Sequence, residues 1–242
     1  MIDIGIATLF PDMCEAFLSE SIIGRARASG AVKIACRNIR DYTLDKHRRV
    51  DDKPFGGGTG MVMQAQPIYD CVTAMISELP EGVKPRLIYM SPQGKTLTQQ
   101  LVKELAAEKS LIILCGHYEG VDKRVLDELA FEEISVGDYV VTGGEMPALM
   151  LTDAVCRLQE GVLPNEDAYS NESHYNGLLE HPQYTRPEEW RGRRVPEVLL
   201  SGHHANIKKW QEEMSVEVTR EKRPDLLEKP TGQNEENKAA GA

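Results

Sequence analysis

Acidic side chains and one arginine lie in or close to three glycine-containing segments of the sequence. The segments are SPQG (91–94), CGHYEG (115–120) and SVGDYVVTGGE (135–145). The charged residues in or after them are Glu119, Asp122, Asp138, Glu145 and Arg157. A carboxylate next to a bound cation contributes up to about 4 kcal/mol at the effective dielectric of a protein surface. The pattern permits a site for a cationic ligand, but by default any single one of these acids is an exposed residue on a helix.

Each of the three segments follows or begins from an apolar run that is typical of a β-strand. Glycine beside a strand gives up packing and usually marks a sharp bend or a close approach of two backbones. Ligands of open α/β sheets bind outside the carboxyl ends of the strands. Backbone N–H and C=O groups in such loops match a flat, polar ligand such as an adenine. The simpler alternative, that the glycines only make tight turns, stays open at this point.

Several standard motifs are absent from the sequence. QGKT (93–96) ends like a phosphate-binding P-loop, but the position of the leading glycine is Tyr89. No G-x-G-x-x-G run and no G-x-S-x-G nucleophile elbow occur. Histidines without metal-ligand spacing include the neighbours His203 and His204, which would point about 100° apart on a helix. Neither a zinc site nor a phosphate-handling hydrolase is predicted.

The composition is that of one large domain, or of one domain with a smaller companion. The 242 residues are 41% hydrophobic and 27% charged, which permits a sizeable core. Apolar runs are far shorter than the ~20 residues that cross a bilayer, and no signal peptide is recognisable. Five scattered cysteines without a CxxC pair indicate reduced, mostly buried thiols. We expect a cytoplasmic protein that does not associate with membranes.

The charge is acidic overall and basic in two places. A net charge of −10 argues against a protein that binds nucleic acid over its whole surface. Residues 33–53 nevertheless carry seven Lys and Arg against four Asp and Glu, and residues 183–223 carry nine against seven. Each segment is either a solvated face or a local contact for phosphates.

Strand-like and helix-like segments alternate along the first 160 residues. The alternation predicts an α/β fold with a mainly parallel sheet that is covered on both faces. Strands are expected at 2–10, 32–39, 86–90, 111–116 and, as a buried strand, within 135–145; helices are expected at 15–29, 66–79, 96–109 (with Thr96 as N-cap) and 146–160. After this domain (1–160) we expect a linker or active-site loop at 161–187, a small helical domain at 188–230 and a disordered tail at 231–242.

Longer strings make the sequence resemble the bacterial tRNA (guanine-N1)-methyltransferases over residues 1–228. The strings, in the order seen in that family, are HRRVDDKPFGGGTGMVM, YMSPQGK, CGHYEGVDKRV, SVGDYVVTGGEMPALMLTDAVCR, GLLEHPQYTRP and VPEVLLSGHHANIKKW. The resemblance implies an enzyme of the SPOUT class that methylates N1 of guanosine 37 of tRNA, beside the anticodon, with S-adenosylmethionine as the donor. It also implies a deep C-terminal trefoil knot in the α/β domain, which is rare among folds, and a homodimer with active sites at the subunit interface.

The resemblance assigns roles to particular residues. Glu172 matches the base that removes the N1 proton, Arg157 matches an arginine that stabilises charge on guanine O6, and Glu119 matches an acid associated with Mg²⁺ dependence. Predicted cofactor contacts are Tyr89, Met90, Ser91, Gly116, Val136, Gly137, Asp138, Tyr139, Val140, Val141, Gly143 and Gly144. Predicted tRNA contacts are His47, Arg48, Asp51, Arg186, Arg191, Arg193, Arg194, Lys208 and Lys209.

Three residues depart from the family pattern. Glu172 stands in place of an aspartate, His117 in place of an arginine and Thr59 in place of a proline. We expect the first to change the reach of the base, the second to weaken a contact to phosphate or base, and the third to loosen a loop. Two alternatives stay open: a knotted methyltransferase that acts on ribose 2′-OH and therefore needs no such base, and a noncatalytic RNA-binding module.

Overall fold

The computed structural model describes residues 1–165 and 167–228, and the chain divides after residue 166 into two compact units. Each unit is described by itself. The tail predicted at 231–242 lies outside the described residues. Within the two described stretches, no helix combines the length and the apolar character needed to cross a bilayer.

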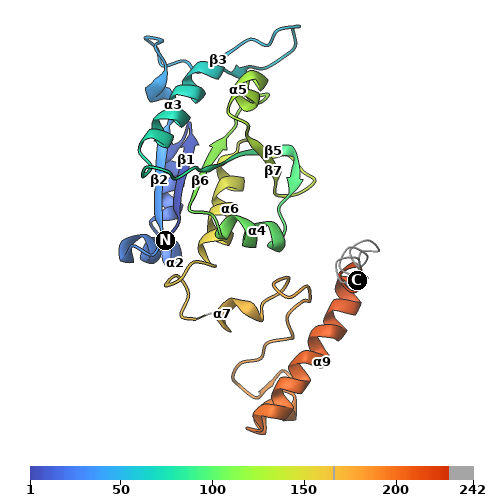
Figure 1. The fold of residues 1–242 in the computed structure, drawn as a ribbon. Coiled ribbons are helices and arrows are strands. Elements are labelled where there is room, and N and C mark those ends of the chain that lie inside the picture. The colour runs from blue at the N-terminus through green and yellow to red at the C-terminus, as the bar shows by residue number, and fades with distance from the viewer. Residues whose placement is uncertain (166, 229–242) are drawn as a thin grey trace, which may run out of the picture. The chain divides into compact units, whose positions relative to one another are not determined.

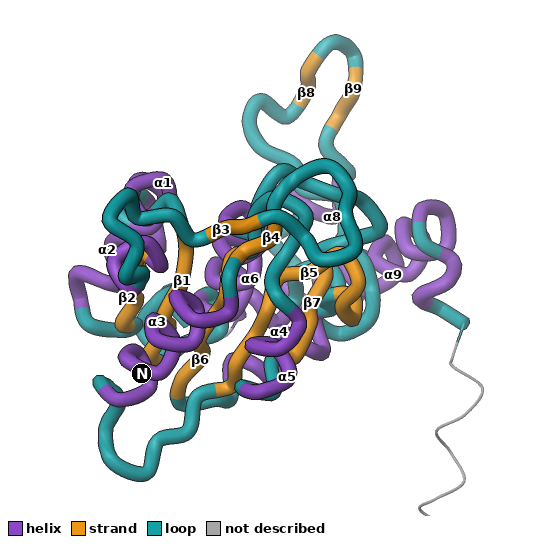
Figure 2. Tube along the Cα trace, turned by 90° about the horizontal axis from the view of Figure 1, so that it is seen from above, coloured by secondary structure: helices purple, strands orange, loops and turns teal. Residues whose placement is uncertain are grey.

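The first unit is built on five parallel strands in the order β2-β1-β6-β5-β7 (Figures 1 and 2). These strands are β1 (Asp3–Thr8), β2 (Lys33–Asn38), β5 (Arg86–Thr96), β6 (Ser110–Cys115) and β7 (Glu132–Ser135). A short antiparallel pair, β3 (Asp51–Asp52) and β4 (Val62–Met63), accompanies them. The prediction of an α/β fold with a mainly parallel sheet is confirmed.

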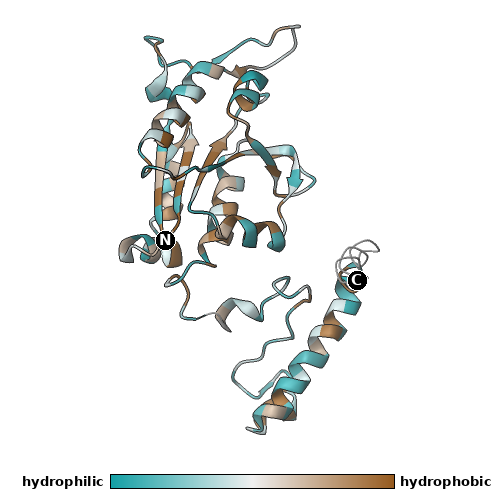
Figure 3. Cartoon of the chain, in the orientation of Figure 1, coloured by the Kyte–Doolittle hydropathy of each residue, from teal (hydrophilic) through white to brown (hydrophobic). Residues whose placement is uncertain are grey.

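Helices cover both faces of this sheet because its strands are apolar on both sides. Along β6, Leu111 and Ile113 join one buried cluster, and Ile112 and Leu114 join the other. Figure 3 shows the hydrophobic colour gathered on the central strands. The first cluster includes residues of α1 (Pro11–Leu18), α2 (Ser21–Ser29), α4 (Gln99–Ala106) and α6 (Glu145–Cys156); the second includes residues of η1 (Ile39–Tyr42), α3 (Ala65–Ser77) and α5 (Lys123–Glu128). Each fully buried aliphatic side chain contributes about 1.5–3 kcal/mol.

Two helices differ from the predicted ones. The single helix expected at 15–29 is two helices, because Glu20 has an extended backbone (φ −105°, ψ 161°) and Ser21 has a positive φ of 54°. The helix expected at 96–109 begins only at Gln99. Its N-cap is Thr98, whose hydroxyl oxygen accepts a hydrogen bond from the backbone N–H of Leu101 at 3.3 Å. Thr96 cannot cap this helix because it still belongs to β5.

Strand β5 continues past its expected end at residue 90. Its register shifts there, so that Met90 and Lys95 both lie opposite Ile134 of β7. Residues 91–94 therefore bulge out between two points that face the same partner residue. The bulge brings Gly94 against the neighbouring backbone, where a Cβ atom would lie 2.3 Å from the carbonyl carbon of Glu133. This close approach accounts for the glycine of SPQG.

The buried strand expected within 135–145 is wrong. Strand β7 ends at Ser135, and a loop follows until α6 begins at Glu145. The loop exposes side chains that a strand prediction would bury, with Val140 81% and Tyr139 55% exposed. Gly137 has a φ of 154°, and Ser135 binds the loop by donating from its hydroxyl to the Gly137 carbonyl at 2.8 Å. The valines and the tyrosine belong to a loop, which composition alone does not distinguish from a strand.

The second unit is organised around the 19-residue helix α9 (His204–Lys222). The rings of His181 and Tyr184 lie 6.1 and 6.4 Å from that of Trp210, and the Leu179 N–H donates to the Thr219 hydroxyl at 2.9 Å. The segment expected to be a linker therefore contributes, from Asp167 on, to this unit. Its other elements are α7 (Asp167–Ser170), the antiparallel pair β8 (Glu189–Trp190) and β9 (Arg193–Arg194), α8 (Glu197–Leu200) and η2 (Pro224–Leu226).

Candidate active site

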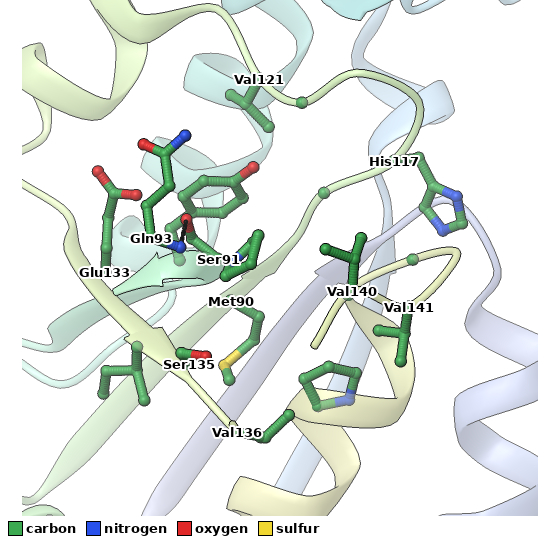
Figure 4. A pocket seen from close by; sticks show the side chains of 18 of the residues that line it. Met90, Ser91, Gln93, His117, Val121, Glu133, Ser135, Val136, Val140 and Val141 are labelled. Carbon is green, nitrogen blue, oxygen red and sulfur yellow. Dashed lines mark hydrogen bonds between the residues drawn. The ribbon is translucent and has the colours of Figure 1, made fainter. Parts of the chain in front are cut away.

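The three glycine-containing segments meet around one cavity of about 450 Å³ at the bulge of β5 and the carboxyl ends of β6 and β7. Figure 4 shows Met90, Ser91 and Gln93 on one side of it, and Val140 and Val141 of the loop after β7 on another. Ten of the twelve predicted cofactor residues line this cavity: Tyr89, Met90, Ser91, Gly116, Val136, Tyr139, Val140, Val141, Gly143 and Gly144. Gly137 and Asp138 lie in the same loop but outside the lining.

Sequence reasoning missed part of the lining. Gln93, Glu133 and Lys123 all line the cavity, and Glu133 and Gln93 are drawn in Figure 4. Glu133 could have been found, because it lies in the strand directly before SVGDYVV, at the edge of the sheet where the other loops emerge. Lys123 lies at the start of α5, directly after the CGHYEG loop. No periodicity in the sequence sets these side chains apart from ordinary surface residues.

The four acids singled out in the sequence have different surroundings. Glu119 is exposed and lines the cavity. Asp122 instead caps helix α5, accepting a hydrogen bond from the Arg124 N–H at 3.0 Å. Asp138 is exposed outside the lining. Glu145 is only 2% exposed, so its default interpretation as an exposed residue of a helix face is wrong.

Burial keeps two titratable groups uncharged, Tyr89 in the lining of the cavity and Cys115, which directly precedes the lining residue Gly116. Removal from water raises the pKa of the Tyr89 phenol, and the charge of Glu133 raises it further. Burial likewise raises the pKa of the Cys115 thiol well above its usual range. Tyr89 is therefore a neutral hydroxyl at physiological pH and can donate a hydrogen bond to a ligand. Cys115 is a neutral thiol and not a nucleophile.

The glycine pair allows two loops to touch backbone to backbone. The Gly144 N–H donates to the Gly116 carbonyl at 2.8 Å. A Cβ atom on Gly144 would lie 2.7 Å from Cα of Cys115, and one on Gly143 would lie 2.3 Å from Cε1 of His117. Real Cβ atoms do not approach other atoms so closely, so position 144 requires glycine against the backbone, and a side chain at position 143 would have to displace the His117 ring. The loops after β6 and β7 therefore form one continuous wall of the cavity.

The three predicted catalytic residues are distributed over both units. Glu119 lines the cavity, and its N–H donates to the Met61 carbonyl at 3.0 Å. Arg157 caps the carboxyl end of α6, where its charge opposes the rise that burial causes in the pKa of Asp153. Glu172 lies in the second unit, and its N–H donates to the Tyr169 carbonyl at 3.2 Å. Within residues 1–165 and 167–228, no three His, Cys, Asp or Glu side chains gather in a way that could hold a metal ion.

The predicted tRNA contacts are surface residues on both units. In the first unit, His47 and Arg48 are exposed on the loop before β3, and Asp51 lies within that strand. The Arg48 guanidinium contacts the Asp41 carboxylate at 3.0 Å. In the second unit, Arg191 lies over the Trp190 ring at 5.0 Å from its centroid. Every basic residue predicted there is exposed: Arg186, Arg191, Arg193, Arg194, Lys208 and Lys209.

His117 makes a different contact from the one we expected at this position. Its Nε2 atom lies 2.6 Å from a carboxylate oxygen of Glu145, and only 17% of its side chain is exposed. Its ring also lies 4.9 Å from that of Phe10. The ring therefore packs against Phe10 and Glu145 while it also lines the cavity, and the expectation of a weakened phosphate or base contact stays a prediction.

A parallel α/β sheet with a cavity at the carboxyl ends of its strands, enclosed by loops in backbone contact, defines a ligand-binding protein of the α/β class. A family model described as tRNA (Guanine-1)-methyltransferase TrmD matches residues 2–229. The chain belongs to this family.

Similar proteins cover nearly the whole chain. A tRNA (guanine-N(1)-)-methyltransferase of Ruminiclostridium cellulolyticum is 58% identical over 229 residues, which are 95% of this chain and 97% of the relative. Proteins of the same name from Lachnospira eligens and Alkaliphilus oremlandii are 53% and 52% identical. They cover 93% of this chain and 95% and 91% of their own lengths, respectively.

Proposed function

We propose that this chain transfers a methyl group from S-adenosylmethionine to N1 of the guanosine at position 37 of tRNA. Family membership over residues 2–229 carries the proposal, and relatives at 52–58% identity are named for methylation of guanine N1 in tRNA. Membership in a family of methyltransferases also weighs against the noncatalytic RNA-binding module. The choice of the guanosine at position 37 and the roles of individual residues belong to the same proposal.

The cavity fits the methyl donor in size and chemistry. Small-molecule sites have volumes of roughly 300–1,000 Å³, and this one has about 450 Å³. Backbone groups of Gly116 and of the loop 136–144 suit the edge of an adenine. Glu119 and Glu133 place two carboxylates in the lining, which favours a cationic ligand. S-adenosylmethionine, when bound, supplies a methyl group on a positively charged sulfur.

Glu172 and Arg157 supply the remaining chemistry in this proposal. Guanine N1 carries a proton that must leave as the methyl group arrives, and the Glu172 carboxylate accepts it. General-base assistance of this kind contributes about 10²–10⁴-fold. Arg157 stabilises the negative charge that develops on guanine O6. Glutamate is one methylene longer than the family's aspartate, so the base reaches further from its backbone.

A second copy of the chain completes each active site in this proposal. Arg157 lies twelve residues beyond Glu145 along α6, or about 18 Å at 1.5 Å per residue, and it does not line the cavity of its own chain. An arginine side chain does not span that distance. The helices α1 and α6 pack together and expose apolar side chains that a dimer would cover: Phe10 at the N-terminus of α1, Met13, Phe17, Met146 and Met150.

Three further features belong to the same proposal. The trefoil knot is proposed because the resemblance to this family implies it. Mg²⁺ would take one ligand from Glu119 and the others from water or substrate, as this ion often does. A location in the cytoplasm follows from a tRNA substrate.

Methylation of two tRNA transcripts tests the proposed function. The full chain is incubated with labelled S-adenosylmethionine and a transcript that has either guanosine or adenosine at position 37. We expect label only in the guanosine transcript, and digestion to nucleosides should place it on the base. Label on a ribose 2′-OH, or equal label in both transcripts, would contradict the proposal.

A further inference from the structure

A buried carboxylate lies directly behind the wall of the cavity. Glu145 is the first residue of α6 and is 2% exposed. It accepts a hydrogen bond from the Thr8 hydroxyl at 2.6 Å and lies 2.6 Å from Nε2 of His117. A buried charge is tolerated only with such partners. The start of a helix adds a favourable field for a negative charge.

The Nε2 atom of His117 lies within hydrogen-bond distance of this carboxylate, beside Gly143. Both the imidazolium and the neutral Nε2–H tautomer can donate, and an ionised carboxylate can only accept. A Cβ atom on Gly143 would lie 2.5 Å from Nε2 of His117 and 2.8 Å from the Glu145 carboxylate. The glycine therefore leaves the space through which His117 reaches Glu145.

This contact joins the two loops that enclose the cavity. His117 belongs to the loop after β6, and Glu145 ends the loop after β7. Apart from the backbone bond between Gly144 and Gly116, the loops are tied by the His117–Glu145 contact. Thr8, at the carboxyl end of β1, donates to the same Glu145 carboxylate. Its hydroxyl oxygen also accepts a hydrogen bond from the Phe10 N–H at 2.9 Å. The loop after β7 is otherwise exposed at Tyr139, Val140 and Val141.

We propose that His117 is a positioning residue for the methyl donor: by binding Glu145, it fixes the loop 136–144 in the shape that encloses the cofactor. This inference rests on the proposed function, because it takes the cavity as the cofactor site. His117 acts through Glu145 and takes no part in the chemical step. Its loss should therefore weaken cofactor binding and leave turnover at saturating cofactor nearly unchanged.

Two substitutions of His117 separate the hydrogen bond from packing. His117→Leu introduces an apolar side chain of similar bulk and removes the hydrogen-bond donor. His117→Gln keeps an N–H donor at nearly the position of Nε2. We expect calorimetry on the full chain to show S-adenosylmethionine binding about tenfold weaker for Leu and within about threefold of wild type for Gln. The KM for S-adenosylmethionine should rise in parallel, while kcat should stay close to wild type.

Asp3→Asn provides a matched control at the opposite end of β1. Asp3 likewise holds a basic side chain at 2.6 Å, that of Lys33, but at the other end of the strand from Thr8. This variant should bind the cofactor like wild type, and Glu145→Gln should bind it more weakly. Thermal melting identifies any variant that does not fold, and the Gln variant of His117 then decides the question.

Equal cofactor affinity in the Leu and Gln variants of His117, whether near wild type or equally weak, would overturn the inference. So would a Leu variant that loses kcat but keeps its affinity. Failure of the proposed function has a different signature, because wild type would then show no binding of S-adenosylmethionine or no methylation of the guanosine transcript.

Discussion

Arg157 and Glu172 are the two side chains on which the chemical step is proposed to depend. Both are assigned to the guanine and not to the methyl donor, so neither should contribute much to binding of the donor. We expect Arg157→Ala and Glu172→Gln each to reduce kcat by about 10²-fold or more, because they remove charge stabilisation and the proton acceptor. Single-turnover methylation of the guanosine transcript measures the loss, and calorimetry should show unchanged cofactor affinity.

Glu172→Asp is the matched control for the base. It keeps the carboxylate, shortens it by one methylene and restores the family's residue, so it should retain most of the activity. Loss of cofactor binding in the Arg157 or Glu172 variants would contradict the roles assigned. Undiminished methylation by Glu172→Gln would favour a ribose 2′-OH target, which needs no base-side carboxylate.

Among the glycines that line the cavity, Gly143 has the shortest distance between the position of a Cβ atom and a neighbouring atom. A branched side chain there would collide with the His117 ring, which lies 2.3 Å from the site of a Cβ atom. Overpacking of this kind costs about 1–3 kcal/mol, so Gly143→Val should weaken S-adenosylmethionine binding by about tenfold or more. Isothermal calorimetry measures the affinity, and melting measures the accompanying loss of stability.

Gly82→Val is the control that distinguishes a collision with the His117 ring from a general loss of stability. Gly82 has a φ of 80°, so valine is strained there, yet nothing lies within 4 Å of its Cβ position. This variant should melt at a lower temperature and bind the cofactor normally. A Gly143→Val protein that melts and binds like wild type would show that the two loops can separate without consequence.

At the scale of single elements, helix α5 depends on its first hydrogen bond. Asp122 accepts from the Arg124 N–H at 3.0 Å, and the Arg124 guanidinium holds the pKa of this carboxyl below its ordinary value of 3.8. Removing an aspartate N-cap costs about 1 kcal/mol. Asp122→Ala should therefore lower the melting temperature at neutral pH, as measured by circular dichroism.

The sign of the pH dependence follows from the lowered pKa. The contribution of Asp122 is fully present above its unfolded-state value of 3.8 and is lost as the pH falls through the lower folded-state pKa. The difference in melting temperature between wild type and Asp122→Ala should thus shrink in acid. Asp122→Asn keeps a cap and should lose only part of the stability. An Asn variant as unstable as the Ala variant would assign the effect to the ion pair with Arg124.

Secondary structure with a clear hydrophobic pattern could be predicted from the sequence. Segments whose structure depends on a partner strand or on tertiary contacts could not. The continuous apolar run Leu111–Cys115 indicated a strand buried on both faces, and the structure buries all of it. The extension of β5 to Thr96 depends on its partner β7, because Ile134 pairs on both sides of the bulge. The loop 136–144 has the composition of a strand, and its contact with the loop after β6, through the Gly144 N–H and the Gly116 carbonyl, cannot be predicted from that composition.

The same division holds for the candidate site. Glycines beside strand ends pointed to the loops that meet at the cavity, since parallel strands bring their carboxyl ends to one edge. The contact between His117 and Glu145 spans 28 positions in the sequence, and nothing in either residue's surroundings along the chain indicates it. Likewise, Glu145 has the sequence context of a surface acid, yet it is buried and contacts Thr8 and His117, which are distant in the sequence.

At the scale of the whole molecule, the proposed reaction needs two chains. The cavity and Arg157 occupy opposite ends of α6, and apolar side chains of α1 and α6 are exposed between them. A closed dimer places the same surface of both copies in contact. It can bring the end of α6 from one copy towards the cavity of the other. Mixed dimers distinguish this arrangement from one in which each chain works alone.

Arg157→Ala and Gly143→Val should complement each other in a mixed dimer. Chains with two different affinity tags are co-expressed, and the dimer that carries both tags is purified. One of its two sites then combines an intact cavity from the Arg157→Ala chain with Arg157 from the other chain, so we expect about half of the wild-type activity. With S-adenosylmethionine kept below its wild-type Kd, the Arg157→Ala parent should be nearly inactive and the Gly143→Val parent should keep about a tenth of the wild-type activity or less.

A second mixed dimer reverses the expectation and serves as the control. It pairs a wild-type chain with a chain that carries both substitutions. If each site is shared, the intact cavity of the wild-type chain faces a partner without Arg157, and the other cavity binds the donor only weakly, so this dimer should have little activity at the same low donor concentration. If each chain supplied its own Arg157, the outcomes would be exchanged: the wild-type chain would work unaided, and the complementing pair would be inactive. The two dimers contain the same substitutions in equal number, so a difference between them cannot arise from stability and reports only which chain serves which site.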